Sequence, residues 1–344
     1  MERIHAWYEH ELIDRAPIRF TAHNAEFNES KAYMGRTWSS LKERWWDVDY
    51  QLDVFENQLK YSVFKAETIP FYWPNLGPEI YAAFYGAELI FQEVTSYSLP
   101  LVHDWQQMEE LRLDFKNSYF LKLEELTKCA LARCKGKYLV GHTSFTPGID
   151  TAASFRDPQQ LCLDMLCEPE KVTELIKIAS RDYQLVYDHF YNMLRNSGQP
   201  SVSWMGIPSY GKMHIPQSDF AYLISPELFE YFVLPSLYEE LKNFTHVIFH
   251  LDGKGVANHI DYLLDIPQIN AIQWVQGMGE DEPIMQWVPL IKKIQAAGKS
   301  VVVDIKLKEL EPFMHEINPK GIFLCIDAPP ETQDDVIKKV HQWR

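Results

Sequence analysis

The amino-acid sequence predicts an α/β fold, a single (β/α)₈ TIM barrel with a largely helical N-terminal extension. Three observations lead to this prediction. The chain has 344 residues, a length that barrels commonly reach around one core. Short apolar runs of β type alternate with long amphipathic stretches, which is the pattern of a parallel sheet. There are about eight such runs, the number that closes a barrel.

The expected strands are short, and a helical stretch follows each of them. They are expected over residues 17–21, 69–73, 138–142, 201–204, 246–250, 271–274, 300–304 and 321–325. Two of the helices between them have clear starts, since Asp157 and Ser225 are each followed by a proline at the first helical position. Pro235 should kink the helix that begins after Ser225.

The chain shows no internal repeat and no linker rich in proline or glycine, so we expect one barrel domain over residues 1–344. Residues 1–68 are rich in tryptophan and largely helical in pattern. They are expected to supply the first strand and helices that decorate the barrel. Residues 69–344 are expected to form the main barrel.

Charge and composition exclude several partners. The chain carries 33 lysines and arginines against 48 aspartates and glutamates, so we expect no binding to nucleic acid or to an anionic membrane. The N-terminus has no apolar signal-peptide core, and no run of about 18 apolar residues occurs. The five cysteines include no CxxC pair. We therefore expect a cytoplasmic protein with reduced thiols.

In a barrel the active site lies where the strands end, at their carboxyl termini. The residues at these positions are aromatic rings with a few imidazoles, amides and carboxylates, which together would form a pocket for an organic ligand. The expected substrate-binding residues are His23, Trp73, Asn75, His142, Trp204, Tyr210, Gln273, Trp274 and Asp304.

The strongest single feature is the stretch His250-Leu251-Asp252-Gly253. Residues i and i+2 of a strand point to the same side, so an imidazole and a carboxylate would converge at the barrel mouth. Such a pair can hold a metal ion or act as an acid/base couple. Alternatively, Asp252 orients the turn and His250 is a hydrogen-bonded core residue.

Three further residues are candidates, each with a structural alternative. Asp219 lies on a loop before the Ser225 helix and is a candidate catalytic carboxylate, or a partner of the helix dipole. Asp304 ends an apolar strand, where an unpaired charge is costly unless Lys306 pairs with it. Cys325 ends the last strand and is a candidate metal ligand or a core thiol.

Three stretches carry a family resemblance: Gln217-Ser-Asp-Phe-Ala-Tyr-Leu-Ile-Ser-Pro-Glu, His250-Leu-Asp-Gly, and Gly321-Ile-Phe-Leu-Cys-Ile-Asp-Ala-Pro-Pro-Glu-Thr. With them, the chain resembles the uroporphyrinogen decarboxylase-like superfamily from about Pro17 to its end. This superfamily of single barrels includes the decarboxylases of haem synthesis and the methylcobamide-dependent methyltransferases.

The decarboxylase branch is the poorer match. Its members carry an arginine-rich segment after the first strand, where this chain reads Thr21-Ala-His-Asn-Ala-Glu. They also have an aspartate closing the second strand, where this chain reads Trp73-Pro-Asn. The resemblance therefore implies poor binding of uroporphyrinogen.

The methyltransferase branch is the closer match. Its members hold zinc with a His-x-Cys-Gly segment and a later cysteine before a Pro-Pro-Glu-Thr-like helix start. Here the segment becomes His250-x-Asp252-Gly, and the later thiol would be Cys325. The resemblance implies a methyltransferase in which His250, Asp252 and Cys325 hold zinc and activate an acceptor for a methyl group. It implies a small-molecule substrate, with a folate or a methylcobamide on a corrinoid protein as candidate donor.

Three alternatives remain open from the sequence. The first is a decarboxylase or other lyase for a smaller or tetrapyrrole-like substrate, with Asp219 or Asp252 as acid/base. The second is a glycoside hydrolase that uses Asp252 and Asp304. The third is a non-catalytic protein that binds a corrinoid or a tetrapyrrole.

Overall fold

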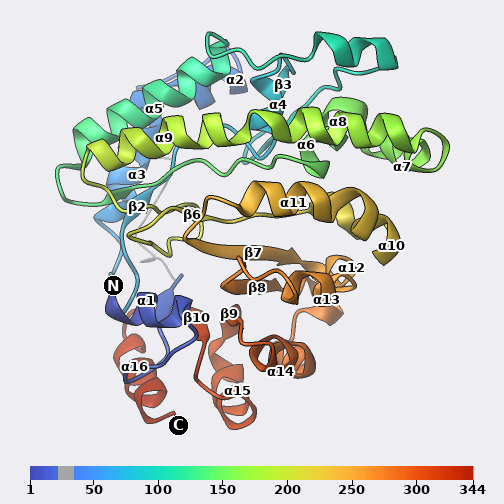
Figure 1. Cartoon of the computed structure of the whole chain (residues 1–344). Helices are drawn as coiled ribbons and strands as arrows, with labels where there is room; N and C mark the ends of the chain where they lie inside the picture. The colour runs from blue at the N-terminus through green and yellow to red at the C-terminus, as the bar shows by residue number, and fades with distance from the viewer. Residues whose placement is uncertain (22–34, 344) are drawn as a thin grey trace.

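The computed structural model describes residues 1–21 and 35–343. At its centre is a six-stranded, wholly parallel sheet that curls into a half-barrel, with the order β1-β10-β9-β8-β7-β6 (Figure 1). Its strands are β1 (Ile18–Phe20), β6 (Met213–His214), β7 (His246–Asp252), β8 (Ala271–Val275), β9 (Ser300–Lys306) and β10 (Ile322–Asp327). The fold is therefore a mixed α/β fold, as expected.

Four shorter strands lie outside this sheet. β2 (Phe71–Tyr72) and β5 (Leu139–Val140) form a parallel pair. β3 (Leu89–Phe91) and β4 (Ser96–Ser98) form an antiparallel hairpin.

The expectation of one continuous eight-stranded sheet is not met in the described residues. Seven of the expected strands form, but residues 201–204 form only an isolated bridge, between Ser201 and Ser209. β6 forms where no strand was expected. Pro70 and Pro74 flank β2, and Pro208 and Pro216 lie on either side of β6. A proline has no N–H to extend a strand ladder.

Single backbone hydrogen bonds join the β2–β5 pair to its neighbours on either side. Glu67 donates to the Ile18 carbonyl at 2.9 Å, and so joins the segment before β2 to β1. On the other side, His142 donates to the Val202 carbonyl at 2.8 Å, and so joins the end of β5 to residues 201–204.

Helices cover the outside of the sheets. In Figure 1, α8, α9 and α11 lie along one side, and α14, α15 and α16 lie along the other. The helices are α1 (Glu2–Tyr8), α2 (Leu41–Trp46), α3 (Val48–Leu59), α4 (Ile80–Ala83), α5 (Ser118–Cys134), α6 (Ile149–Arg156), α7 (Pro158–Cys167), α8 (Pro169–Arg181), α9 (Tyr183–Asn196), α10 (Pro226–Leu228), α11 (Leu234–Leu241), α12 (Gly253–Ala257), α13 (Ile260–Leu264), α14 (Val288–Ala296), α15 (Leu310–Glu316) and α16 (Gln333–Gln342).

The predicted helix starts are confirmed. The Asp157 side chain accepts backbone N–H groups at 2.9 and 3.1 Å at the start of α7, and Ser225 caps α10. After α10 the chain passes through a π-helical turn (Phe229–Val233) before α11. Pro235 is the second residue of α11, just after this turn, and has no N–H for the helical ladder, which explains the local irregularity.

Helix α1 closes one end of the half-barrel. The Trp7 side chain is fully buried, and its Nε1 donates to the Gly321 carbonyl at 2.9 Å, just before β10 begins. The Ser300 hydroxyl, at the start of β9, donates to the Trp7 carbonyl at 2.6 Å. Since α1 fills the end where the strands begin, the opposite end, where they finish, is the one left for a site. We call this end the mouth.

No helix in the described part of the chain has the length and apolar character needed to cross a membrane. All five cysteines lie in this part, and none forms a disulfide.

Candidate active site at the mouth

Strand alternation brings His250 and Asp252 together at the end of β7. Val247, Phe249 and Leu251 are fully buried, while His250 and Asp252 lie on the other face of the strand. His250 Nε2 is 3.9 Å from Asp252 Oδ2. The expected convergence of an imidazole and a carboxylate is present.

A glutamine on the neighbouring strand orients the imidazole. His250 Nδ1 lies 2.6 Å from Gln273 Oε1. An amide oxygen only accepts, so Nδ1 is the donor, and the lone pair of the neutral ring is on Nε2, the nitrogen closer to Asp252. The Trp204 ring meets the imidazole edge-on at 5.1 Å. His250 is therefore fixed in tautomer and orientation.

Asp219 completes a cluster with these two residues. Asp219, His250 and Asp252 each offer one ligand-type atom, and these three atoms lie within 4.8 Å of one another. Gln217, bridged to His250 by backbone pairing, donates to Asp219 Oδ2 at 3.1 Å. Burial raises the pKa of Asp219; the His250 charge opposes this shift and the Asp252 charge adds to it.

Asp150 anchors the segment that carries Asp219. Its carboxylate, in the first turn of α6, accepts the backbone N–H groups of Asp219 at 3.1 Å and Phe220 at 2.9 Å. Burial, and then the Asp219 charge, raise the pKa of Asp150 to about 8, while these two hydrogen bonds lower it. Asp150 was not among the residues expected at the site.

The turn Asp219–Leu223 also packs directly on the turn that follows Asp252. The Tyr222 ring lies so close to Gly255 that a Cβ built there would come within 2.2 Å of it. His259, fully buried, hydrogen-bonds the Ala221 carbonyl through Nε2 at 2.9 Å and stacks on Phe229. The positions of Asp219 and Asp252 are therefore linked through packed neighbours.

A second group of polar side chains lies on β1, β9 and β10. Arg19, Cys325 and Asp304 are register partners across these strands, and the Arg19 guanidinium donates to the Met205 carbonyl. Burial raises the pKa of Asp304, while the Arg19 and His250 charges lower it. Lys306 pairs with Glu282 at 2.7 Å, so the expected alternative of an Asp304–Lys306 pair does not occur.

Cys325 does not join the ligand cluster. Within the described part of the chain, two groups of histidine, cysteine and acidic residues come close enough to hold a metal, and neither includes Cys325. Its side chain packs in the apolar interior with Phe323 and Val302. Burial raises the pKa of its thiol to about 12, so the thiol stays protonated at neutral pH. Asp219 takes the place that the sequence gave to Cys325.

Trp73, Asn75 and His23 were also expected to bind the substrate. Trp73 is half-buried at the end of β2, and Asn75 accepts the backbone N–H of Gly77 at 2.8 Å, which makes it part of a turn. His23 lies outside the described residues.

The other three predicted residues contact other parts of the structure or face solvent. His142 packs on Tyr187 of α9, and burial lowers its pKa to about 4. Trp274 is fully buried against Trp287, because its neighbour Gln273 takes the inward side of β8. Tyr210 is 65% exposed near the start of β7, at the closed end. We therefore leave these three out of the site.

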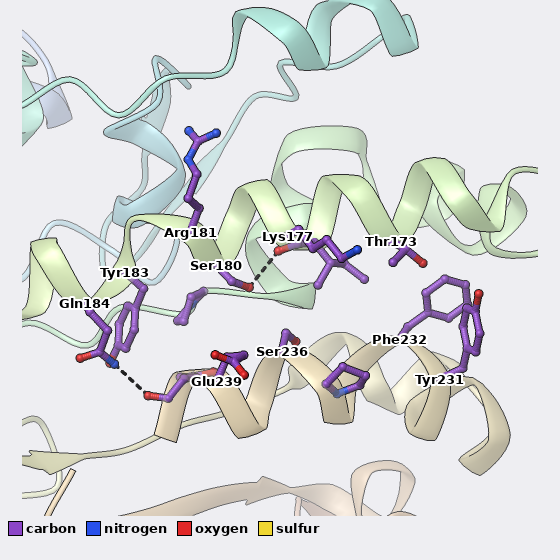
Figure 2. Close-up of a pocket in the computed structure, with 14 residues that line it drawn as sticks. Thr173, Lys177, Ser180, Arg181, Tyr183, Gln184, Tyr231, Phe232, Ser236 and Glu239 are labelled. Atoms are coloured by element: carbon purple, nitrogen blue, oxygen red, sulfur yellow. Dashed lines mark hydrogen bonds between the residues drawn. The ribbon is translucent and has the colours of Figure 1, made fainter. Parts of the chain in front are cut away.

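A pocket of about 530 Å³ adjoins the Asp219 side of the mouth. Its walls include Asp150, Gln217, Asp219, Phe220, Thr146 and Tyr97. It is large enough for a small organic ligand and brings that ligand to the carboxylates. A second pocket, of about 540 Å³, lies in the outer wall between α8 and α11 (Figure 2).

A buried polar network borders this outer pocket. Glu240 Oε1 lies 2.5 Å from His214 Nε2, and the Tyr183 hydroxyl lies 3.0 Å from His214 Nδ1. Burial raises the pKa of Glu240 well above its usual value and lowers the pKa of His214 to about 3. These shifts favour the neutral form of both groups, in which the protonated Glu240 carboxyl donates a hydrogen bond to the imidazole.

Replacing Glu240 by glutamine should preserve the fold, because an amide N–H still donates to His214 Nε2. Glu240→Ala leaves that nitrogen unpaired and should cost about 1–3 kcal/mol. A raised carboxyl pKa makes the wild type lose stability as pH rises above its unfolded pKa. The difference in Tm, Glu240→Gln minus wild type, should therefore become more positive between about pH 5 and about pH 8. A difference that falls with pH would show that Glu240 is ionised.

Comparison with known proteins supports the fold. No family model matches the sequence, and no curated protein matches it. Among solved structures, a methyltransferase from Methanosarcina mazei is similar, with a TM-score of 0.62 and 11% identity, covering 95% of this chain and 93% of that chain. At this identity the similarity establishes the fold and leaves the chemistry to be argued from the residues.

Proposed function

We propose that this chain is a methyltransferase-like enzyme of the uroporphyrinogen decarboxylase-like superfamily, with its active site at the mouth. One observation carries the proposal: Asp219, His250 and Asp252 converge at the end of β7, where barrel enzymes have their active sites. The similarity in fold to a methyltransferase over nearly the whole chain agrees with it.

The three side chains fit a divalent metal. They supply one imidazole nitrogen and two carboxylates, a ligand set that zinc accepts. The bond from His250 Nδ1 to Gln273 is the kind of outer contact that orients a metal-binding histidine. A zinc ion held there would lower the pKa of a substrate thiol or hydroxyl and so favour its reactive, deprotonated form.

Other residues of the mouth would serve binding and proton transfer. Asp304 has a raised pKa, so it can accept the proton that leaves the acceptor. Trp204 and Trp73 would wall the substrate, and the 530 Å³ pocket would hold its remaining part. The donor we propose is a methylcobamide, free or on a corrinoid protein, with a folate as the other candidate. A methylcobamide would supply the methyl group, and the acceptor thiolate would supply the electron pair of the new S–C bond.

A lyase or decarboxylase is the second candidate. The raised pKa values of Asp219 and Asp304 favour it, because a carboxyl group with a raised pKa keeps its proton to a higher pH than usual and can then act as a general acid. This function needs neither a metal nor a methyl donor.

We also propose that the half-barrel, the β2–β5 pair and residues 201–204 together form one closed barrel domain. The single backbone hydrogen bonds of Glu67 and His142 support this, because they bridge two of the three breaks in the ladder, those between β1 and β2 and between β5 and residues 201–204.

Elemental analysis of the purified protein tests the metal site. We expect zinc in the wild type, and about one ion fewer per chain in His250→Ala, because the imidazole is the only nitrogen donor of the cluster. His315→Ala, which removes an exposed histidine of α15, should leave the content unchanged. A folded His250→Ala protein with the wild-type zinc content would contradict metal-assisted methyl transfer at the mouth and favour the lyase.

A further inference from the structure

A second cluster of ligand-type side chains lies at the closed end of the half-barrel. His5 is in α1 and Glu9 follows its last residue, Tyr8, so these two side chains lie on one face, four residues apart. His246 is the first residue of β7. His5, Glu9 and His246 each offer one ligand-type atom, and the three atoms lie within 4.8 Å of one another.

The imidazole of His246 is held in place before any ion arrives. Its Nδ1 is 2.7 Å from the Ser209 hydroxyl, and the Tyr8 ring stacks on it at 4.2 Å. Nε2 is therefore the nitrogen that faces the cluster, 3.3 Å from Glu9 Oε1.

The backbone that carries the other two ligands, His5 and Glu9, is also held in place. Trp7 and Tyr8, which lie between His5 and Glu9, donate side-chain hydrogen bonds to the carbonyls of Gly321 and Ile207. Ordering the site on metal binding should therefore cost little conformational entropy. His5 and Glu9 are exposed, so an ion can enter from solvent and keep water in its remaining positions.

We propose that His5, Glu9 and His246 form a divalent metal site, separate from the mouth, that takes Zn²⁺ and clamps α1 to the start of β7. Two imidazole nitrogens and one carboxylate are a ligand set that zinc proteins use, with water in the fourth position. His246 begins the strand that His250 and Asp252 end, so the two sites lie at opposite ends of β7. This proposal does not depend on the function proposed for the mouth.

The test uses Zn²⁺ alone and a protein in which the mouth ligand is removed. In His250→Ala, titration with zinc against a chromogenic chelator should show one remaining site per chain, and zinc should raise the Tm by a few degrees. Adding His5→Ala should weaken this binding by about tenfold or more and abolish the Tm shift. Glu9→Gln should weaken it as well, because the amide keeps the size of the side chain and loses its charge.

A second histidine variant serves as the control for the zinc titration. His250→Ala combined with His315→Ala should bind zinc like His250→Ala alone. If His250→Ala binds no zinc, or if His5→Ala leaves both the affinity and the Tm shift unchanged, the clamp is refuted. If His5→Ala removes one ion from a protein that still has His250, the clamp is supported even where the mouth binds no metal.

Discussion

Replacing Asp252 with asparagine is expected to lower methyl transfer by on the order of 10³-fold, the loss typical of removing a group that stabilises charge at a reacting atom. Asparagine keeps the shape of the side chain but removes the negative charge that faces His250 Nε2 at 3.9 Å. The Asp252 side chain is 51% exposed. Folding should therefore change little, by about 0.5 kcal/mol or less.

The measurement is methyl transfer from methylcobalamin to a small thiol, together with the Tm of each protein. Asp327 offers a matched control, since it ends β10 of the same sheet, three strands away from β7, and is exposed. Asp327→Asn should keep the wild-type rate. A wild-type rate in Asp252→Asn, or a fall in Tm of several degrees, would give Asp252 a purely structural role and remove the main support for the proposed site.

Truncating Trp7 to alanine is expected to destabilise the protein by about 3–5 kcal/mol, the usual cost of deleting a large buried aromatic side chain. The ring is fully buried and contacts Tyr8 and Phe323. Trp7→Ala would leave a cavity between α1 and the starts of β9 and β10, and would leave the Gly321 carbonyl without its indole donor.

Urea unfolding followed by circular dichroism measures this effect. Trp7→Phe is the matched variant, since it keeps an aromatic ring and loses the hydrogen bond from Nε1. It should cost less, about 1–2 kcal/mol. If Trp7→Ala unfolds at the wild-type urea concentration, α1 does not stabilise the closed end, and the metal clamp would lose its structural basis as well.

The alternation of strand residues made part of the mouth predictable. His250 and Asp252 are two apart in an apolar run, so their convergence followed from the sequence alone. The same rule could have pointed to Arg19, which lies between the buried residues Ile18 and Phe20 in β1. A charged side chain at such a position faces away from its buried neighbours, so the place of Arg19 at the mouth was also predictable.

Other features depend on contacts between distant parts of the chain. Asp150 accepts backbone N–H groups of a segment about 70 residues away, and no local pattern indicates such a contact. For Trp274, the sequence could not tell which of two neighbours faces inward, because that depends on the register between strands. The loss of Cys325 from the ligand cluster likewise reflects how deep its position lies in the half-barrel, which strand pairing sets.

The fold was easier to predict than the closure of the sheet. The strands expected over residues 246–250 and 300–304 form as β7 and β9, and each is only two residues longer at its carboxyl end than expected. The strands β2 and β5 shortened to two residues each. The prolines that flank β2 are visible in the sequence, but how far they shorten a ladder depends on which neighbouring strand needs the missing N–H.

The contact between Gly255 and Tyr222 has a consequence for how sequence variation around the mouth should be read. Any side chain at position 255 would push the Tyr222 ring away, and with it the turn that carries Asp219. A survey of tolerated substitutions would then give position 255 the intolerance usually taken as the mark of a chemical role, although glycine brings no functional group. Intolerance at this position would measure the space between two neighbouring turns.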